Sequence, residues 1–300
     1  MSVPISLLVG ATGQIGRQML QRLGRRALAT TRAADPPLGW LPLDLASLAT
    51  STDAELTLRQ VELDAIYCIA GMTNVEACED QQELAFRVNA QAPAALATIA
   101  CRRNIPFVYY STEYIFDGED GPYREEQQAN PISVYGRSKL AGEIAVLTAH
   151  PGALILRTTV VYGPDAAQKN FLYSLMRNLK AGQSMRVPED QVSTPTYNLD
   201  LAVATEELVA RRASGVFNVC GPELLSRLEF ATRIAVELGL DASLILGLPT
   251  VSLGQRAPRP LRAGLCTNKL RREHPDLLMR TLSESMVDCR PTIQQFLIAD

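Results

Sequence analysis

Histidine is scarce in this sequence, and cysteine is scattered. The 300 residues include two histidines and six cysteines, and no two cysteines form a CxxC pair. A structural zinc site needs about four such ligands, usually closely spaced in pairs, so we predict no metal site. Because the chain starts without a secretory signal pattern, we also expect reduced cysteines.

The sequence also lacks long apolar runs and clusters of basic residues. No stretch approaches the roughly twenty consecutive apolar residues that span a bilayer. The formal net charge is −3, without a run of lysine and arginine, so the surface offers no strong attraction for nucleic acid or an anionic membrane. We therefore expect a cytoplasmic protein that binds neither nucleic acid nor membranes and has small-molecule partners.

Short apolar segments that alternate with helical patterns are present instead. The helical patterns include 83–104, and the alternation is typical of an α/β protein with a doubly wound, Rossmann-like parallel sheet. After residue 164 the alternation loosens. We therefore predict a dinucleotide-binding domain over 1–164 and a smaller substrate-binding lobe over 165–300, partly interleaved with the sheet. The expected strands of the first part are 5–9, 27–31, 66–70, 107–110 and 153–158.

A glycine-rich turn follows the first expected strand directly. Its glycines are spaced three apart, and a helical pattern follows them. Such a turn lets a pyrophosphate approach the N-terminus of the helix, whose free N–H groups and dipole stabilise negative charge. The triplet alone is a weak signal, but the alternating strands strengthen it. We predict that this turn binds a dinucleotide through Gly10, Thr12, Gly13, Gln14, Ile15 and Gly16.

The end of the second expected strand indicates which dinucleotide is bound. An acidic residue there suits the ribose 2′-hydroxyl of NAD, whereas an arginine suits the 2′-phosphate of NADP. The sequence has Arg32 at this position, with Asp35 nearby. We predict that NADPH is preferred and that NADH remains possible. Asp44 is a candidate partner of the adenine amine, or alternatively a helix N-cap.

A tyrosine and a lysine four residues apart lie in the helical stretch ISVYGRSKLAGE. On a helix, Tyr135 and Lys139 share one face. A phenol is a poor proton donor or acceptor at neutral pH unless a nearby positive charge stabilises its anion, and Lys139 could supply that charge. Ser111 and Thr112 end the strand at 107–110 and could hydrogen-bond a substrate carbonyl at the sheet edge.

Together these motifs resemble the extended short-chain dehydrogenase/reductases, and within them the dTDP-4-dehydrorhamnose reductase branch. The resemblance covers nearly the whole chain. Beyond the glycine turn it rests on STEYIFDG (111–118), YREE (123–126), NPISVYGRSKLAGE (130–143), LRTTVVYG (156–163), EDQVSTPTYNLDLA (189–202) and RPLRAGLCTNKL (259–270).

The resemblance implies reduction of the C4 ketone of a nucleoside-diphosphate 4-keto-6-deoxy sugar by NADPH, and it makes a homodimer plausible. Tyr135 would donate the proton, Lys139 would lower its pKa and hold the ribose, and Thr112 would orient the carbonyl. The further cofactor residues would be Leu45, Ala70, Gly71, Thr73, Asn89 and Thr158. The substrate residues would be Ser111, Thr112, Gln191, Thr194 and Arg259.

Other functions use the same motifs. Nucleotide-sugar dehydratases carry two acids after the catalytic threonine, where this chain has Glu113 and Tyr114. Tyrosine is a poor substitute for a carboxylate base at neutral pH, so dehydration is disfavoured, and epimerisation is ranked similarly. The regulatory subunit of methionine adenosyltransferase also resembles this branch, yet it acts by binding a partner enzyme. A non-catalytic, NADP-binding role therefore stays open.

Overall fold

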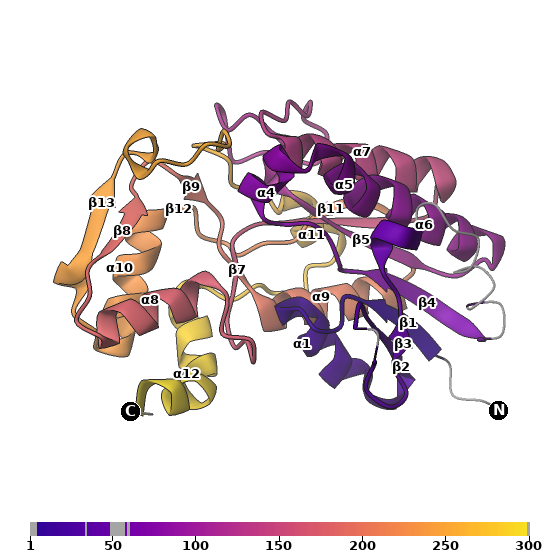
Figure 1. The fold of residues 1–300 in the computed structure, drawn as a ribbon, viewed down its shortest axis with the longest axis horizontal. Coiled ribbons are helices and arrows are strands. Elements are labelled where there is room, and N and C mark those ends of the chain that lie inside the picture. Colours follow the sequence, from indigo (N-terminus) through magenta and orange to yellow (C-terminus); the bar gives the residue numbers. More distant parts are fainter. Residues whose placement is uncertain (1–4, 34, 49–57, 59–60, 299–300) are drawn as a thin grey trace.

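The computed structural model describes residues 5–33, 35–48, 58 and 61–298. Within these ranges a parallel sheet of seven strands forms the centre of the molecule (Figure 1). The chain adds strands on one side of β1 and then returns to add the others on the opposite side, which confirms the doubly wound prediction. In spatial order the strands are β11 (Gly215–Asn218), β6 (Leu154–Thr158), β5 (Phe107–Thr112), β4 (Leu63–Cys68), β1 (Ile5–Val9), β2 (Ala27–Thr31) and β3 (Leu41–Pro42).

Helices cover both faces of this sheet. Alternate strand residues point to opposite faces, so Leu8 of β1 packs toward α1 and α9, whereas Leu7 and Val9 pack toward α6 and α7. Because neither face meets water, the strands read as apolar runs. The helices of this part are α1 (Gln14–Leu23), α2 (Leu45–Leu48), α4 (Val75–Asp80), α5 (Gln82–Phe86), α6 (Ala92–Arg102), α7 (Val134–Ala149) and α9 (Asn198–Ala210).

A second hydrophobic core lies on the left of Figure 1, away from the sheet. It is enclosed by helices and by the parallel pair β8 and β13. Both α9 and β11 follow residue 164, yet they belong to the central sheet and its cover. α11 (Asn268–Glu273) packs against the edge strand β11 through Leu270 and Lys269. The elements outside the central layers are β7 (Val161–Tyr162), α8 (Phe171–Lys180), β8 (Met185–Pro188), β9 (Val192–Ser193), β10 (Thr196–Tyr197), β12 (Leu225–Ser226), α10 (Arg227–Leu238), β13 (Ile245–Leu248) and α12 (Leu282–Ile298).

The helix expected over 83–104 is not one continuous α-helix. A π-helical turn over Arg87–Gln91 separates α5 from α6. Pro93 follows this turn, and proline has no N–H to bond the carbonyl four residues earlier, which belongs to Asn89. That carbonyl accepts the Tyr109 hydroxyl instead, at 2.6 Å. The proline and the tyrosine together account for the change in helical register.

Neither a membrane span nor a metal cluster is found in the described part of the chain. No helix there has both the length and the apolar character needed to cross a bilayer. No group of three His, Cys, Asp or Glu side chains within these ranges could hold a metal ion.

A buried ion pair joins α7 to the sheet. Arg157 of β6 donates to both carboxylate oxygens of Glu143, at 3.0 and 2.7 Å, and also to the backbone carbonyl of Glu125 at 2.9 Å. The two side chains are only 7% and 4% exposed. Removing one partner would leave the other charged and buried, which is costly even where the intact pair contributes little.

We expect Arg157→Ala to lower the free energy of unfolding by about 3–5 kcal/mol, measured by urea denaturation. The control is Arg124→Ala, which removes an exposed ion pair with Glu126 and should cost at most about 1 kcal/mol. Equally small losses in both variants would show that the buried pair does not anchor α7.

Candidate active site

The crevice between β1 and β4 is where the strand order reverses, the position at which open α/β sheets bind ligands. Gly10 follows β1 and Ala70 follows β4. Gly10 has φ +97°, and a Cβ added there would lie 2.7 Å from the Ala70 backbone nitrogen. Only glycine therefore permits the two loops to pack this closely at the mouth of the crevice.

The glycine turn fits a dinucleotide pyrophosphate. A Cβ on Gly16 would lie 2.0 Å from the Gly10 carbonyl oxygen, so this glycine lets α1 pack on the turn. Gly13, in contrast, is exposed, and a Cβ there would make only an ordinary 3.5 Å contact. No described side chain caps the first turn of α1. The structure thus leaves open the side of the turn from which a phosphate would approach.

The other residues of the turn differ in their surroundings. Thr12 is exposed, and Ile15 packs against the core beneath α1. The amide of Gln14 donates to the Val161 carbonyl at 3.2 Å and accepts from the Asn170 amide at 3.0 Å, so it links the turn to the segment that follows β6. Their contacts with a cofactor stay predictions.

The residues expected near the adenosine end lie after β2 and β3. Arg32 is exposed, immediately after β2. Asp44 accepts from the Ala46 amide at 3.2 Å, which confirms the helix-cap interpretation; its contact with adenine stays a prediction. Leu45 is buried in the core, and Thr73 is exposed.

Three residues of the predicted catalytic set converge at the C-terminal edge of the sheet. Tyr135 and Lys139 lie on consecutive turns of α7 and are 9% and 5% exposed. Thr112 ends β5, and its hydroxyl is close enough to the Tyr135 phenol to lower the pKa of that phenol. Thr158 ends β6 in register with Thr112 and donates to Thr196 at 3.1 Å. The sheet therefore brings together residues that are distant in the sequence.

Burial dominates the pKa of Tyr135 in this structure, and the expected effect of Lys139 on that pKa stays a prediction. Burial raises the pKa of Tyr135, the Thr112 hydroxyl lowers it, and nearby Tyr114, Cys78 and Glu113 raise it. Lys139 donates to the Tyr110 carbonyl at 2.5 Å, and its ammonium lies 4.0 Å above the Tyr109 ring. Burial also lowers the pKa of Lys139 to about 8, so it is mostly protonated at neutral pH and Tyr135 holds its proton.

Asn89 positions the loop after β4. Its amide oxygen accepts from the Met72 N–H at 2.8 Å, and its amide nitrogen donates to the Met72 carbonyl and to the Ser138 hydroxyl. A Cβ on neighbouring Gly71 would lie 3.9 Å from the Lys139 ammonium. The loop backbone therefore passes beside Lys139.

Two of the residues expected to contact substrate, Gln191 and Thr194, form hydrogen bonds with distant parts of the chain. Thr194 accepts from the Leu265 amide at 3.0 Å, and Gln191 donates to Thr250 and Gln255. Ser111 is 5% exposed, and its hydroxyl has no hydrogen-bond partner among the described residues.

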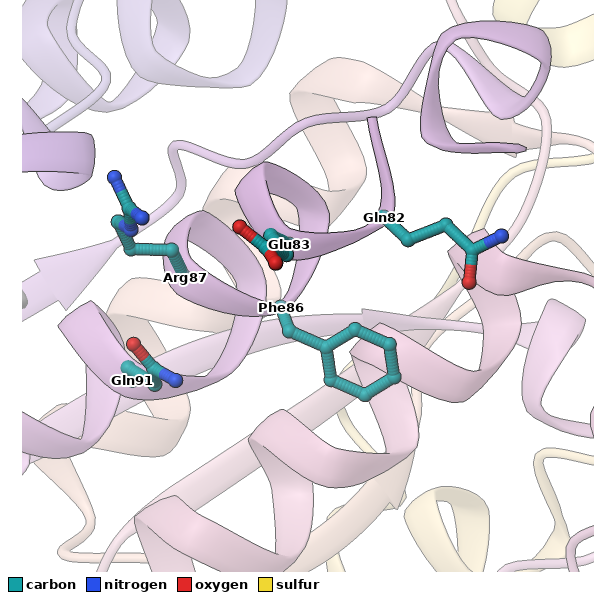
Figure 2. A pocket seen from close by; sticks show the side chains of 5 residues that line it. All are labelled: Gln82, Glu83, Phe86, Arg87 and Gln91. Atoms are coloured by element: carbon teal, nitrogen blue, oxygen red, sulfur yellow. The ribbon is translucent and has the colours of Figure 1, made fainter. Parts of the chain in front are cut away.

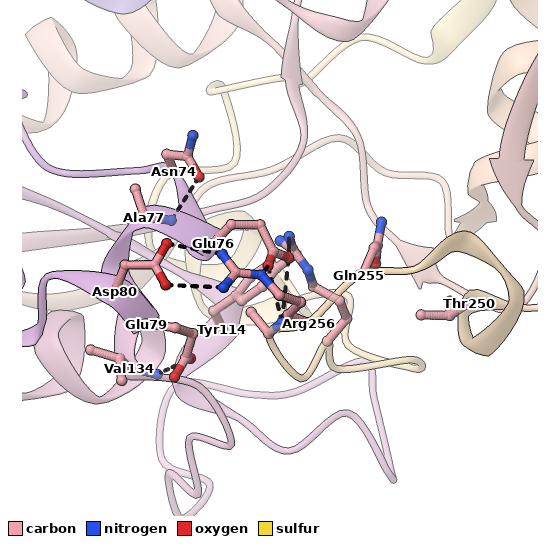
Figure 3. Close-up of polar contacts among 12 residues, drawn as sticks. Asn74, Glu76, Ala77, Glu79, Asp80, Tyr114, Val134, Thr250, Gln255 and Arg256 are labelled. Carbon is pink, nitrogen blue, oxygen red and sulfur yellow. Dashed lines mark hydrogen bonds and ion pairs between the residues drawn. The ribbon is translucent and has the colours of Figure 1, made fainter.

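Ion pairs connect the segment of residues 255–259 to α4, as Figure 3 shows. Arg256 donates to both oxygens of Asp80, at 3.1 and 2.9 Å. Arg259 donates to Glu76 at 2.9 Å and to the Tyr114 hydroxyl at 3.3 Å. Tyr114 in turn packs edge-to-face with Tyr135, with ring centroids 5.4 Å apart. The network thus runs from the surface to the side of Tyr135.

Sequence reasoning missed Arg227, which belongs to the same cluster. It is the first residue of α10, and the electrostatic fields of Glu113, Tyr114 and Arg259 all act on it. The available signal was the capping box that precedes it, Ser226-x-x-Glu229, which marks the helix start. The helix dipole is positive at its N-terminal end and makes a cation there unfavourable. An arginine at this position is therefore a second signal in the sequence.

A surface cavity of about 390 Å³ lies elsewhere, along α5 and the π-helical turn (Figure 2). Its lining includes none of the predicted site residues, so it does not belong to the cluster described above. The residues that line it are Gln82, Glu83, Phe86, Arg87 and Gln91.

The fold and this cluster define a dinucleotide-binding protein with the tyrosine and lysine of a short-chain dehydrogenase/reductase. The family model described as RmlD substrate binding domain matches residues 5–288. The chain belongs to this family.

Comparisons with individual proteins agree. The chain is 34% identical over 266 residues to the probable low-salt glycan biosynthesis reductase Agl14 of Haloferax volcanii, covering 87% of this chain and 89% of the relative. It is 33% identical over 273 residues to the dTDP-4-dehydrorhamnose reductase of Mycobacterium tuberculosis, covering 88% and 85%. The crystal structure of the Bacillus anthracis dTDP-4-dehydrorhamnose reductase in complex with NADP is similar with a TM-score of 0.87 at 26% identity, covering 97% of this chain and 100% of that one.

Glu113, directly after Thr112, is a buried carboxyl group in the cluster. It is 4% exposed and accepts from the Gly264 amide at 3.0 Å. Burial raises the pKa of Glu113 from 4.5 to about 7, although hydrogen bonds and Arg227 oppose the shift. Its charge therefore changes near neutral pH.

We expect Glu113 to make stability depend on pH. An acid whose pKa rises on folding binds its proton more tightly in the folded state, so its contribution to stability is lost as the pH rises from 4.5 through about 7. Urea denaturation across this window should show that the free energy of unfolding falls more steeply with rising pH for the wild type than for Glu113→Gln. Glu126→Gln is the control, because the pKa of exposed Glu126 is lowered and lies below the window. Identical pH profiles in all three proteins would contradict the assignment.

Proposed function

We infer that this chain is an NADPH-dependent reductase that converts the C4 ketone of a nucleoside-diphosphate 4-keto-6-deoxy sugar to an alcohol. The observation that carries this inference is the convergence of Thr112, Tyr135 and Lys139 beside the crevice between β1 and β4. Membership of the family, and relatives named dTDP-4-dehydrorhamnose reductase, support the substrate class. The neighbour that binds NADP supports the cofactor.

The residues that would hold NADPH are the 10–16 turn, Arg32, Asp44, the loop containing Ala70 and Gly71, and Lys139. Bound there, NADPH supplies a hydride to C4 of the sugar. The open side of Gly13 and the backbone of Gly71 beside Lys139 both fit this placement.

The side chains would handle the proton. Tyr135 has a raised pKa, so it is protonated at neutral pH and can donate its proton to the ketone oxygen as C4 is reduced. Lys139 carries three N–H donors, one of which donates to the Tyr110 carbonyl. The remaining donors can bind the cofactor ribose, and the positive charge stabilises the phenolate left behind. Thr112, which lies beside the phenol, would orient the carbonyl.

We propose that residues 1–164 bind the cofactor and that 165–300 supply much of the substrate site. Arg259 and Gly264 support this division, because they hydrogen-bond Tyr114 and Glu113, just after β5, from the second half of the chain. The return of α9 and β11 to the sheet makes the two parts interleaved.

Neither of the competing functions has a specific structural observation in its favour. Tyr114, in the place of a dehydratase's second acid, has its hydroxyl bonded to Arg259. A purely regulatory role differs from the reductase in one measurable respect, because it requires no turnover of a ketosugar.

We expect Tyr135→Phe to lower kcat at least about 100-fold, because the proton donor is lost, while NADPH affinity changes by less than about twofold. The assay follows NADPH oxidation with dTDP-4-keto-L-rhamnose generated in situ. Tyr67→Phe, which removes a hydroxyl from a buried tyrosine in the core beneath α1 and α9, should keep full activity. Undiminished turnover in Tyr135→Phe would refute the role of this residue.

A second expectation concerns the cofactor. Arg32→Ala should weaken NADPH binding about ten- to a hundredfold, because it removes a charge-assisted bond to the 2′-phosphate, and should change NADH binding little. Fluorescence titration measures both, with Arg25→Ala as the control because Arg25 is another exposed arginine near β2. Equal losses for the two cofactors would exclude a phosphate contact.

A further inference from the structure

The side chains that would carry out the reduction are enclosed by the fold. Thr112, Tyr135 and Lys139 are all buried. A sugar that is reduced at Tyr135 must touch the phenol, and a nucleotide-sugar is much larger than the opening that such burial leaves. Part of the enclosing structure must therefore move aside when the sugar enters and when the product leaves.

The segment of residues 255–259 is part of this enclosure. Ala257 is 2% exposed and packs in one hydrophobic cluster with Tyr135. Arg259 donates to the Tyr114 hydroxyl, and the Tyr114 ring packs against the Tyr135 ring. The segment therefore covers one side of Tyr135.

The 255–259 segment is anchored on either side but not along its own backbone. Before it, Thr250 donates to Asp190 through both its amide and its hydroxyl. After it, the Leu261 carbonyl accepts from the Val192 amide at 2.6 Å. Among the residues that the structure describes, no backbone-to-backbone hydrogen bond holds the segment itself. Packing and side-chain contacts therefore keep it in place.

Contacts with α4 supply this attachment. Arg256 donates to both oxygens of Asp80, at 3.1 and 2.9 Å, and Figure 3 shows the guanidinium facing that carboxylate. Glu76 accepts from the Ala257 amide at 3.2 Å. Because α4 comes from the first half of the chain and Arg256 from the second, these contacts join the two halves beside Tyr135.

The pair of Arg256 and Asp80 is suited to reversible closure. Its side chains are 66% and 53% exposed, so water and salt weaken the attraction between them. The planar, two-bond contact nevertheless fixes the direction in which the two groups meet. Gly254, just before the segment, has φ +67°, and a Cβ there would meet no atom within 4 Å. The chain therefore has room to bend at this glycine.

Resting on the proposed function, we propose that Arg256 and Asp80 form a latch that holds the 255–259 segment closed over Tyr135, and that the sugar enters and the product leaves only while this latch is open. Both are positioning residues, because they act by holding the segment and not by touching the sugar. The closed segment shields the transfer of hydride and proton from water, and its opening controls exchange with solvent.

A latch has a specific kinetic signature. When a ligand binds only to the open state, a larger open fraction in the free and the bound protein raises the association and dissociation rate constants by the same factor. Kd then stays constant. A residue that contacts the ligand changes Kd instead.

Stopped-flow mixing of dTDP with the full chain, saturated with NADPH, tests this signature. Arg256→Gln should raise both rate constants about two- to fivefold, as expected for the loss of one exposed bidentate pair, and should leave Kd nearly unchanged. Added potassium chloride should raise the dissociation rate constant more in the wild type than in the variant, because salt screens the latch. Arg272→Gln is the matched control, since Arg272 is 68% exposed and pairs only with the adjacent Glu273 among the described residues.

Exchanging the two charges separates a latch from other effects of losing the arginine. Asp80→Arg combined with Arg256→Asp reverses the pair and should return both rate constants to within about twofold of the wild type. Each single substitution should raise them. Unchanged rate constants in Arg256→Gln would overturn the proposal, and so would a change in Kd as large as the change in the dissociation rate constant, which indicates a contact with the ligand.

Hydrogen exchange measured by mass spectrometry tests the latch without a ligand and separates it from the reductase assignment. In Arg256→Gln the Ala257 amide, which donates to Glu76, should exchange about two- to fivefold faster than in the wild type and in Arg272→Gln. Faster exchange in a protein that neither binds dTDP nor reduces a ketosugar supports the latch and rejects the reductase. Ketosugar reduction with wild-type exchange and wild-type rate constants in the variant rejects only the latch.

Discussion

The polar side chains that α7 buries against the sheet must each find a partner there, and the active site depends on this constraint. Buried polar groups are costly unless they are hydrogen-bonded. Ser138 bonds the Asn89 amide, Lys139 bonds the Tyr110 carbonyl, and Glu143 pairs with Arg157. These contacts fix the rotation of α7 about its axis and its position along that axis. They therefore place Tyr135 beside Thr112.

Two glycines of α7 make its close packing against the rest of the site sterically possible. A Cβ on Gly136 would lie 2.1 Å from the Tyr114 carbonyl oxygen, and one on Gly142 would lie 2.2 Å from the Asn89 carbonyl oxygen. The helix thus approaches both the segment after β5 and the π-helical turn at backbone distance. Close approach excludes water and lowers the local dielectric, which is why burial dominates the pKa values of Tyr135 and Lys139.

The substrate side is built differently, from charges that meet across segments. Arg256 and Arg259 connect the 255–259 segment to carboxylates of α4, and Tyr114 connects Arg259 to the catalytic tyrosine. Backbone contacts position Tyr135 and Lys139, whereas ion pairs and aromatic rings hold the 255–259 segment beside them.

The sequence alone was sufficient for several features that depend on local order, although the strand expected at 66–70 lies at Leu63–Cys68. The first strand, its glycine turn and α1 follow from apolar spacing and from glycine's freedom, and the four-residue spacing of Tyr135 and Lys139 follows from helical geometry. Tertiary structure decided what depends on contacts between distant residues. The π-helical turn needs the Tyr109 hydroxyl at the carbonyl that Pro93 leaves free, and Arg227 reaches the site only through strand pairing. The direction of the Tyr135 pKa was also decided there, because burial is a property of the assembled fold and not of any local pattern.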